Sequence, residues 1–268
     1  MRGQDLRRSE THPRPFVMGI LNVTPDSFSD GGRYTDADAA VEHAFRMIDE
    51  GAEIIDIGAE STRPGFTPVP AEEEIARLIP VIERLRQSSD VIISADTMKT
   101  ETARAAISAG ADIINDVNAL RWPGMLDLLS ESDVPAVVMH MTGSPADTHS
   151  QTVEGPVIDA VRDFLNGRIA AAEDRGVSRD MLIIDPGIGF GKTMWQNGEL
   201  IRNLDLIGIG LPMLVGVSRK RVLATMYPGM DADEATVRAS LTAAEKGADI
   251  LRVHDVGRVA EAVQNMNL

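Results

Sequence analysis

Each of eight short apolar runs in the chain ends in residues whose side chains can do chemistry. The residues at these ends are Asn22, Asp56, Asp96, Asn115 with Asp116, His140, Asp185, Ser218 with Arg219 and Lys220, and Arg252 with His254. A single such residue is commonly the cap of a following helix. A polar or ionisable group at every end instead indicates a site for a polar ligand, provided that the fold brings the ends together.

These candidate residues divide into hydrogen-bond acceptors and cations. The acceptors are Asp96, Asn115 and Asp185. A carboxylate accepts two parallel N–H bonds, so such side chains suit an amidine-like or aminopyrimidine edge. The cations are Arg63, Arg219, Lys220, Arg252 and His254. The residues alone therefore predict a nitrogen heterocycle on one wall of a site and an anion, such as a phosphate, on the other.

Apolar segments alternate with amphipathic ones along almost the whole chain. The expected strands cover 16–21, 53–57, 91–95, 112–115, 135–139, 181–184, 213–217 and 249–253. The expected helices cover 37–50, 72–87, 100–109, 123–131, 156–175, 197–207, 234–246 and 257–265. Continuous apolar runs of this length suit strands buried on both faces of a parallel sheet. We therefore expect an α/β fold, a single-domain (β/α)8 TIM barrel over residues 16–268, with a doubly wound open sheet as the alternative.

Composition limits the possible partners. The formal net charge is −15, and a surface of this sign repels nucleic acid. The chain has no cysteine, which excludes disulfides and thiolate metal sites. Residues 1–15 contain no apolar stretch of signal-peptide length and are expected to form a flexible tail. No apolar segment is long enough to cross a membrane. Together with the negative charge, this leads us to expect a cytoplasmic protein with neither a nucleic-acid nor a membrane partner.

The segment 185–193, DPGIGFGKT, has the composition of a phosphate-binding loop but not its spacing. The pattern GxxxxGK[ST] requires glycine at the position of Pro186. The glycines are expected instead to allow close approach of the backbone to a flat ligand, with Phe190 stacking or packing nearby.

The sequence gives little support to a zinc site or to a serine nucleophile. His140 and His254 lack the spacing of a zinc site. Magnesium is a different case, since it takes few protein oxygens and many from substrate phosphates, so Asn22 could suffice as its protein ligand. Ser218 has no GxSxG context, which argues against a serine nucleophile.

Taken in order, several strings in the chain resemble the dihydropteroate synthase family of pterin-binding barrels. They are MGILNVTPDSFSDGG (18–32), DIGAESTRPG (56–65), ADT (95–97), NDV (115–117), MH (139–140), DPGIGFGKT (185–193), GVSRK (216–220) and RVHDV (252–256). The resemblance implies a transferase of folate biosynthesis that condenses 6-hydroxymethyl-7,8-dihydropterin pyrophosphate with p-aminobenzoate, giving 7,8-dihydropteroate and pyrophosphate. It also implies a Mg²⁺ requirement, sulfonamide sensitivity and a homodimer.

The resemblance assigns roles to individual residues. The expected catalytic residues are Lys220, Asp96, Asp185, Arg252 and His254. The expected pterin-binding residues are Asp96, Asn115, Met139, Asp185, Phe190, Gly216 and Lys220. Pyrophosphate is expected at Asn22, Arg63, Arg252 and His254, with Asn22 also contacting the metal. The aminobenzoate is expected at Phe28, Thr62, Pro64 and Ser218.

Some positions depart from the family pattern. They are Ala95, Asn118 with Ala119, Gln196, Arg221 and Val222. Arg221 and Val222 lie near the substrate rim and could alter the aminobenzoate side. Two other functions remain open at this point: a pterin- or folate-binding methyltransferase acting on a corrinoid protein, and a non-catalytic pterin-binding relative. The methyltransferase would keep the acids but would not need the anion site.

Overall fold

The computed structural model describes residues 1–23, 33–60, 68–144 and 151–266, and within 33–36 only the backbone. Its parallel strands form one sheet in the order β6-β5-β4-β3-β2-β1-β8-β7. The strands are β1 (Phe16–Asn22), β2 (Ile54–Gly58), β3 (Ile92–Asp96), β4 (Ile113–Asp116), β5 (Ala136–Met139), β6 (Leu182–Asp185), β7 (Leu214–Val215) and β8 (Ile250–Val253). A parallel bridge between Ile184 and Met213 joins the two ends of this order, so the sheet closes into a barrel.

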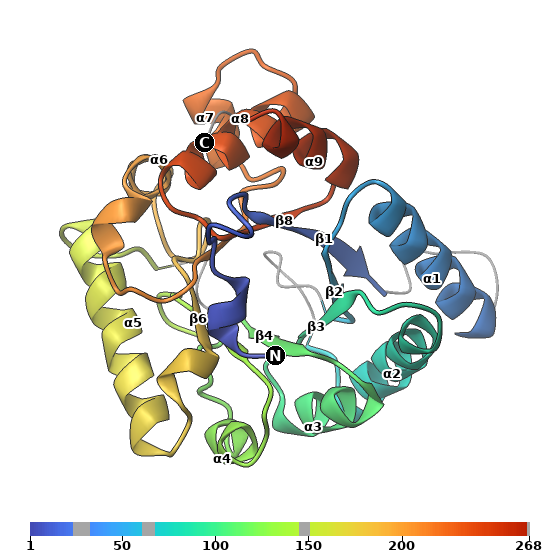
Figure 1. Ribbon diagram of the computed structural model, residues 1–268. Coiled ribbons are helices and arrows are strands. Elements are labelled where there is room, and N and C mark those ends of the chain that lie inside the picture. Colours follow the sequence, from blue (N-terminus) through green and yellow to red (C-terminus); the bar gives the residue numbers. More distant parts are fainter. Residues whose placement is uncertain (24–32, 61–67, 145–150, 267–268) are drawn as a thin grey trace.

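Helices surround the barrel on its outside (Figure 1). They are α1 (Arg33–Asp49), α2 (Ala71–Ser88), α3 (Thr100–Ala109), α4 (Met125–Ser130), α5 (Val157–Asp174), α6 (Met194–Arg202), α7 (Val222–Met226), α8 (Ala232–Glu245) and α9 (Val256–Gln264). Short 3₁₀ turns occur at η1 (Gly3–Leu6), η3 (Arg179–Met181) and η4 (Leu204–Ile207). The (β/α)8 expectation is confirmed, and closure of the sheet excludes the doubly wound alternative.

The helix expected over 197–207 begins and ends elsewhere. Thr193 caps α6 by accepting the N–H of Gln196, and the Gln196 side chain accepts the Thr193 N–H in return. This capping box sets the helix start three residues earlier than the apolar pattern indicates. At the other end, Asn203 leaves helical geometry with φ −137°, and the chain continues as η4 rather than as the same helix. The short helix α7 was not expected from the sequence.

The inward-facing side chains of the barrel change from apolar to polar along each strand. One inner cluster is apolar and consists of Leu6, Phe16, Met18, Ile54, Ile92, Ile113, Val137, Ile183, Leu214 and Ile250. Two residues further along four of these strands stand Asp56, Asn115, Asp185 and Arg252. Because side chains alternate with a period of two, each of these points into the same interior as the apolar residue before it. The polar residues therefore form a second layer at the carboxyl ends of the strands.

The N-terminal segment closes the apolar end of the barrel. Figure 1 shows it lying across the middle of the ring of strands. Leu6 is only 1% exposed and packs in the apolar inner cluster, while the Arg8 N–H donates to Asp249 Oδ1 at 2.9 Å. This differs from the flexible tail expected over 1–15, because one leucine in a polar stretch is enough to seal an apolar opening.

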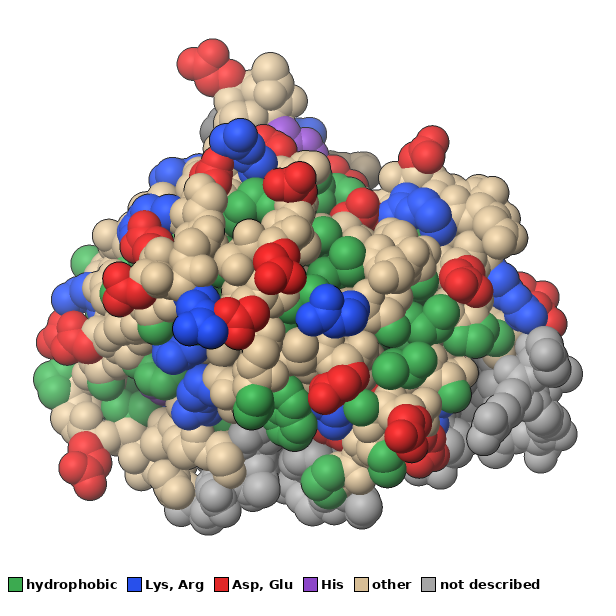
Figure 2. Space-filling model, turned by 90° about the horizontal axis from the view of Figure 1, so that it is seen from below, with side chains coloured by type: hydrophobic (Ala, Val, Ile, Leu, Met, Phe, Trp, Pro, Cys, Tyr) green, Lys and Arg blue, Asp and Glu red, His purple; other side chains and the backbone are tan. Residues whose placement is uncertain are grey.

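The surface carries charges of both signs. On the face seen in Figure 2, basic side chains are scattered among acidic ones and do not gather into one large patch. None of the helices that the structure describes is long and apolar enough to cross a membrane.

We expect Leu6→Ala to lower the free energy of unfolding by about 2–5 kcal/mol, the usual cost of truncating a buried leucine. Urea unfolding followed by circular dichroism measures this. The matched control is Leu206→Ala in η4, where the leucine is 55% exposed and truncation should cost little. Equal stability of the two variants would contradict the sealing role of Leu6.

Candidate active site at the carboxyl ends of the strands

The structure brings most of the predicted site residues to one end of the barrel. Those that lie at or just beyond the carboxyl ends of strands are Asn22, Asp96, Asn115, Met139, Asp185, Gly216, Ser218, Lys220, Arg252 and His254. Phe190 lies in the loop after β6. Phe28, Thr62, Arg63 and Pro64 lie outside the described residues. The predicted hydrogen-bond acceptors and three of the predicted cations, Lys220, Arg252 and His254, therefore share one rim.

Arg252 is the central cation of this rim. Its Nε donates to Asp56 Oδ2 at 2.6 Å and its Nη2 donates to Asp96 Oδ2 at 2.6 Å. Asp56 is fully buried and also accepts the Ser94 hydroxyl at 2.6 Å and the Asn115 side-chain amide at 3.1 Å. The sequence analysis placed Asp56 at a strand end but gave it no role. The structure makes it the residue through which these groups meet.

Burial sets the protonation of the acids and bases around Arg252. It raises the pKa of Asp96 to about 7, although the Arg252 charge opposes the rise. It also raises the pKa of Asp185, against the pull of Lys220 and of the Gly187 N–H. Burial works against the charge of Arg252 itself, but Asp56 and Asp96 outweigh it and hold the Arg252 pKa above its ordinary value. The guanidinium is thus a permanent positive charge, and the Asp96 carboxyl beside it has a pKa close to neutrality.

Lys220 lies between the loop after β6 and the barrel interior. Its ammonium donates to the Ile188 carbonyl and lies 5.1 Å from the centre of the Phe190 ring. Burial lowers the pKa of Lys220 to about 8, with Asp185 opposing the change. Lys220 and Phe190 therefore lie side by side, in a cation–π arrangement.

The glycines of 185–193 are needed for a reason different from the one expected. A side chain at Gly187, where φ is +65°, would place its Cβ 1.8 Å from the His140 carbonyl oxygen. At Gly191, with φ +64°, a Cβ would lie 2.4 Å from the Thr142 side chain. Both glycines thus allow this loop to pack against the loop after β5. Contact with a flat ligand is not what these two positions require.

Lys192 is a buried residue to which the sequence analysis gave no role. Its Nζ contacts His140 Nδ1 at 2.8 Å, the Gly187 carbonyl at 2.8 Å and the Phe190 carbonyl at 3.0 Å. These contacts tie the loop after β6 to His140. The signal in the sequence is that Lys192 is the one cation in the glycine-rich loop 185–193. The sequence analysis compared this loop only with the phosphate-binding pattern, which it does not match.

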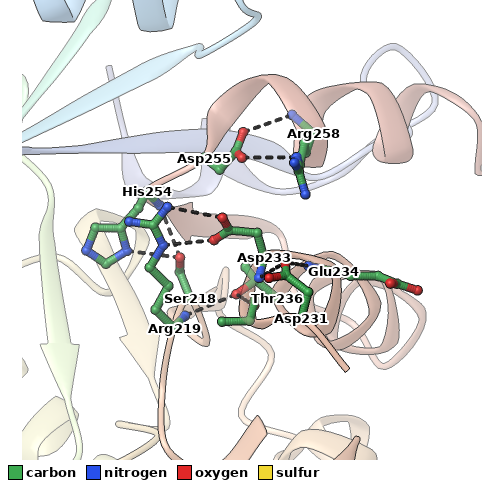
Figure 3. Close-up of polar contacts among 10 residues, drawn as sticks. Ser218, Arg219, Asp231, Asp233, Glu234, Thr236, His254, Asp255 and Arg258 are labelled. Atoms are coloured by element: carbon green, nitrogen blue, oxygen red, sulfur yellow. Dashed lines mark hydrogen bonds and ion pairs between the residues drawn. The ribbon is translucent and has the colours of Figure 1, made fainter. Parts of the chain in front are cut away.

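Ser218 and His254 join the loops after β7 and β8, as Figure 3 shows. The Ser218 hydroxyl oxygen accepts the His254 backbone N–H at 3.2 Å and lies 2.9 Å from His254 Nδ1. This contact fixes the orientation of the His254 ring relative to the loop after β7. Beside them, Arg219 has φ +56° and pairs with Asp233 at 2.8 Å. The predicted aminobenzoate-side serine therefore orients a predicted pyrophosphate-side histidine.

We expect acid to weaken the fold through His140. Burial, and next the charge of Lys192, lower its pKa from 6.5 to about 3, so the imidazole is neutral in the folded protein and charged in the unfolded chain at pH 4.5. Its contribution is complete above pH 6.5 and falls toward about pH 3, at a limiting rate of roughly 1.4 kcal/mol per pH unit. Unfolding free energies at pH 7 and 4.5 measure this in the wild type and His140→Gln.

The comparison with His140→Gln removes titrations that both proteins share. Asp96 and Asp116, whose pKa values burial raises to about 7, act in the opposite direction and add stability as the pH falls. The stability advantage of the wild type over His140→Gln should therefore shrink on acidification. A constant difference between the two proteins would contradict a neutral buried His140.

Comparison with known proteins matches this arrangement to one family. Residues 18–254 match the family described as pterin binding enzyme. The chain is similar to the dihydropteroate synthase of Streptococcus pyogenes serotype M3, with 48% identity over 250 residues and 90% of each chain covered.

Two solved structures of Xanthomonas albilineans dihydropteroate synthase are also similar. The one with 4-aminobenzoic acid has a TM-score of 0.87 and 48% identity, covering 94% of this chain and 92% of that one. The one with 7,8-dihydropteroate has a TM-score of 0.83 and 45% identity, with the same coverage. The chain belongs to the pterin-binding enzymes, among the dihydropteroate synthases.

Proposed function

We propose how the side chains of this rim carry out the dihydropteroate synthase reaction. The observation that carries the proposal is the position of Arg252, which is bonded to the acceptor wall while belonging to the predicted anion wall. A ligand that joins a nitrogen heterocycle to a diphosphate fits a rim on which acceptors and a cation are bonded together. Pterin pyrophosphate is such a ligand, and the Xanthomonas relatives were solved with 4-aminobenzoic acid and with 7,8-dihydropteroate.

The pterin lies against the acceptors. Asp96, Asn115 and Asp185 accept hydrogen bonds from its ring and amino N–H groups. Lys220 and Phe190 complete this side of the pterin site, where the ring of Phe190 offers an apolar face. Met139 and Gly216 come from β5 and the end of β7 and complete the pterin pocket.

The diphosphate lies against Arg252 and His254, with Asn22 and Arg63 completing its site. Asn22 ends β1 at the same rim and is half-buried, so its amide oxygen is a suitable donor to a hard cation. Among the described residues, no group of three or more histidines and carboxylates could hold a metal ion. One amide oxygen with substrate phosphates and water is therefore the donor set that fits Mg²⁺ here. When bound, this ion neutralises diphosphate charge.

The chemistry needs no side-chain nucleophile. The bond between the pterin methylene carbon and the diphosphate oxygen breaks with its electron pair moving to oxygen. The amine nitrogen of p-aminobenzoate then bonds to this carbon and loses a proton to solvent. Arg252 and His254 stabilise the charge that develops on the leaving oxygens, and Asp96 and Asp185 stabilise positive charge on the pterin. The remaining rate acceleration comes from holding the amine nitrogen in line with the pterin methylene carbon.

The aminobenzoate lies on the Ser218 side of the rim, and Phe28, Thr62 and Pro64 remain its further expected binding residues. A sulfonamide occupies the same space and competes with it, and a Yersinia pestis relative was solved with a sulfonamide complex. The small-molecule substrates, a homodimer and a cytoplasmic address complete the proposal. A corrinoid methyltransferase is less well supported, since Arg252 and His254 have no task in it.

A crossed pair of variants tests the two walls. His254→Gln should weaken binding of pterin pyrophosphate by about tenfold, the loss of one hydrogen bond to a charged group, and change binding of unphosphorylated 6-hydroxymethylpterin less than threefold. Asp96→Asn should weaken both ligands by about tenfold to a hundredfold. Calorimetric titration of each ligand gives the four affinities. Equal losses of the two ligands in His254→Gln would contradict the anion assignment.

We expect alkaline loss of activity through Lys220. With its pKa lowered to about 8, the ammonium is charged below that pH and loses its proton above it. The kcat/KM for pterin pyrophosphate should therefore fall above about pH 8. In Lys220→Arg, whose side chain stays charged, the residual activity should show no such decline up to pH 10. An unchanged alkaline limb in this variant would assign the titration to another group.

A further inference from the structure

We propose that Asp56 is the positioning residue that fixes both walls of the site at once. The proposal rests on the assignments under Proposed function and adds to them a residue that does not itself contact substrate. Asp56 is fully buried beneath the rim, so it acts through the residues it binds. Those residues are Asn115 on the pterin side and Arg252 on the diphosphate side.

Asp56 sets the orientation of the Asn115 amide. The Asn115 Nδ2 lies 3.1 Å from Asp56 Oδ2. Only the amino end of an amide can donate to a carboxylate, so this contact decides which end of the Asn115 amide faces Asp56. The Oδ1 end remains as an acceptor for a ring N–H of the pterin. Without the carboxylate, nothing in this contact would prevent the amide from turning by 180°.

Asp56 also sets the plane of the Arg252 guanidinium. Nε bonds to Asp56 and Nη2 to Asp96, each at 2.6 Å, so two separate carboxylates hold two corners of the group. Two charge-assisted bonds fix a planar fork, whereas one would leave it free to rotate. The remaining N–H donors then point in a set direction, toward the proposed diphosphate site.

Both contacts use the same oxygen atom. Oδ2 of Asp56 accepts from Asn115 and from Arg252, while Oδ1 accepts the Ser94 hydroxyl at 2.6 Å. Ser94 thus binds only the other oxygen and leaves Oδ2 for Asn115 and Arg252. Because one atom serves both walls, removing it must disturb both, and removing only its charge must disturb mainly Arg252.

Two substitutions of Asp56 separate these effects. Asp56→Ala removes the acceptor and should weaken both pterin pyrophosphate and unphosphorylated 6-hydroxymethylpterin by about tenfold to a hundredfold. Asp56→Asn keeps one acceptor oxygen and removes the charge. It should weaken pterin pyrophosphate by about tenfold and change the unphosphorylated pterin less than threefold. The KM for p-aminobenzoate should change less than twofold in both. Loss of both ligands to the same extent in Asp56→Asn, or no loss in either variant, would overturn the proposal.

Matched variants show whether a loss is only structural. Ser94→Ala removes a bond to Asp56 but leaves Oδ2 in place, so both affinities should stay within threefold of the wild type. Asp249→Ala removes another buried carboxylate, 6% exposed, at the opposite end of the barrel, where it accepts the Met213 N–H at 2.9 Å. It should lower the melting temperature without changing either affinity. Affinity losses in Asp249→Ala that match those of Asp56→Ala would reduce Asp56 to a structural role.

A double-mutant cycle tests whether Asp56 acts through Asn115. If it does, Asp56→Ala with Asn115→Ala should bind unphosphorylated pterin within threefold of Asn115→Ala alone. If the affinity loss of the double variant is instead the product of the two single losses, Asp56 does not act through Asn115, and this part of the proposal is overturned. If Asn115→Ala alone leaves pterin binding unchanged, the pterin assignment under Proposed function fails instead. The Arg252 limb is then decided separately by Asp56→Asn and pterin pyrophosphate. Should Asp56→Ala fail to fold, Asp56→Leu, which is similar in size to aspartate and cannot accept a hydrogen bond, replaces it in the cycle.

Discussion

A positive charge inside a barrel must be paired, and the structure depends on how Arg252 meets this condition. Its guanidinium lies among strands where water cannot fully solvate it, and it is held by Asp56 and Asp96. Removing charges from water costs several kcal/mol per ion, which only good geometry and further hydrogen bonds offset. Ser94 and Asn115 supply these bonds to Asp56. The cluster is therefore stable as a whole and not as separate pairs.

The apolar end of the barrel makes such a cluster possible. The inner residues of the first layer, with Leu6 sealing the opening, exclude water from one side of the polar layer. Polar groups above them can be approached only from the carboxyl ends of the strands. Low water content also strengthens every interaction at that end, and it is the common cause of the raised pKa of Asp96 and the lowered pKa of Lys220. Packing at one end thus sets the electrostatics at the other.

Much of this could be predicted from the sequence because strand residues alternate with a fixed period. Apolar runs ending in Asp96, Asn115 or Asp185 place these side chains inside a barrel once the barrel is assumed. The partner of Arg252 could not be predicted in the same way. β8 and β2 are separated by β1, so the meeting of Arg252 and Asp56 depends on strand tilt, which no local pattern encodes. Lys192 and the start of α6 were missed because loop packing and a capping box, not apolar period, determine them.

The Asp96 carboxylate, which binds Arg252 and is proposed to bind the pterin, offers a physical reason for a substrate that carries both heterocycle and diphosphate. Arg252 uses only Oδ2 of Asp96, and a carboxylate offers about four lone-pair positions, so the pterin can bind the same group without displacing the arginine. In the proposed complex, a pterin N–H donor at Asp96 lies close to the Arg252 guanidinium. A diphosphate joined to that pterin meets this cation without a separate loss of translational freedom. The two walls are thus parts of one hydrogen-bonded unit, and they favour the joined substrate over its separate halves.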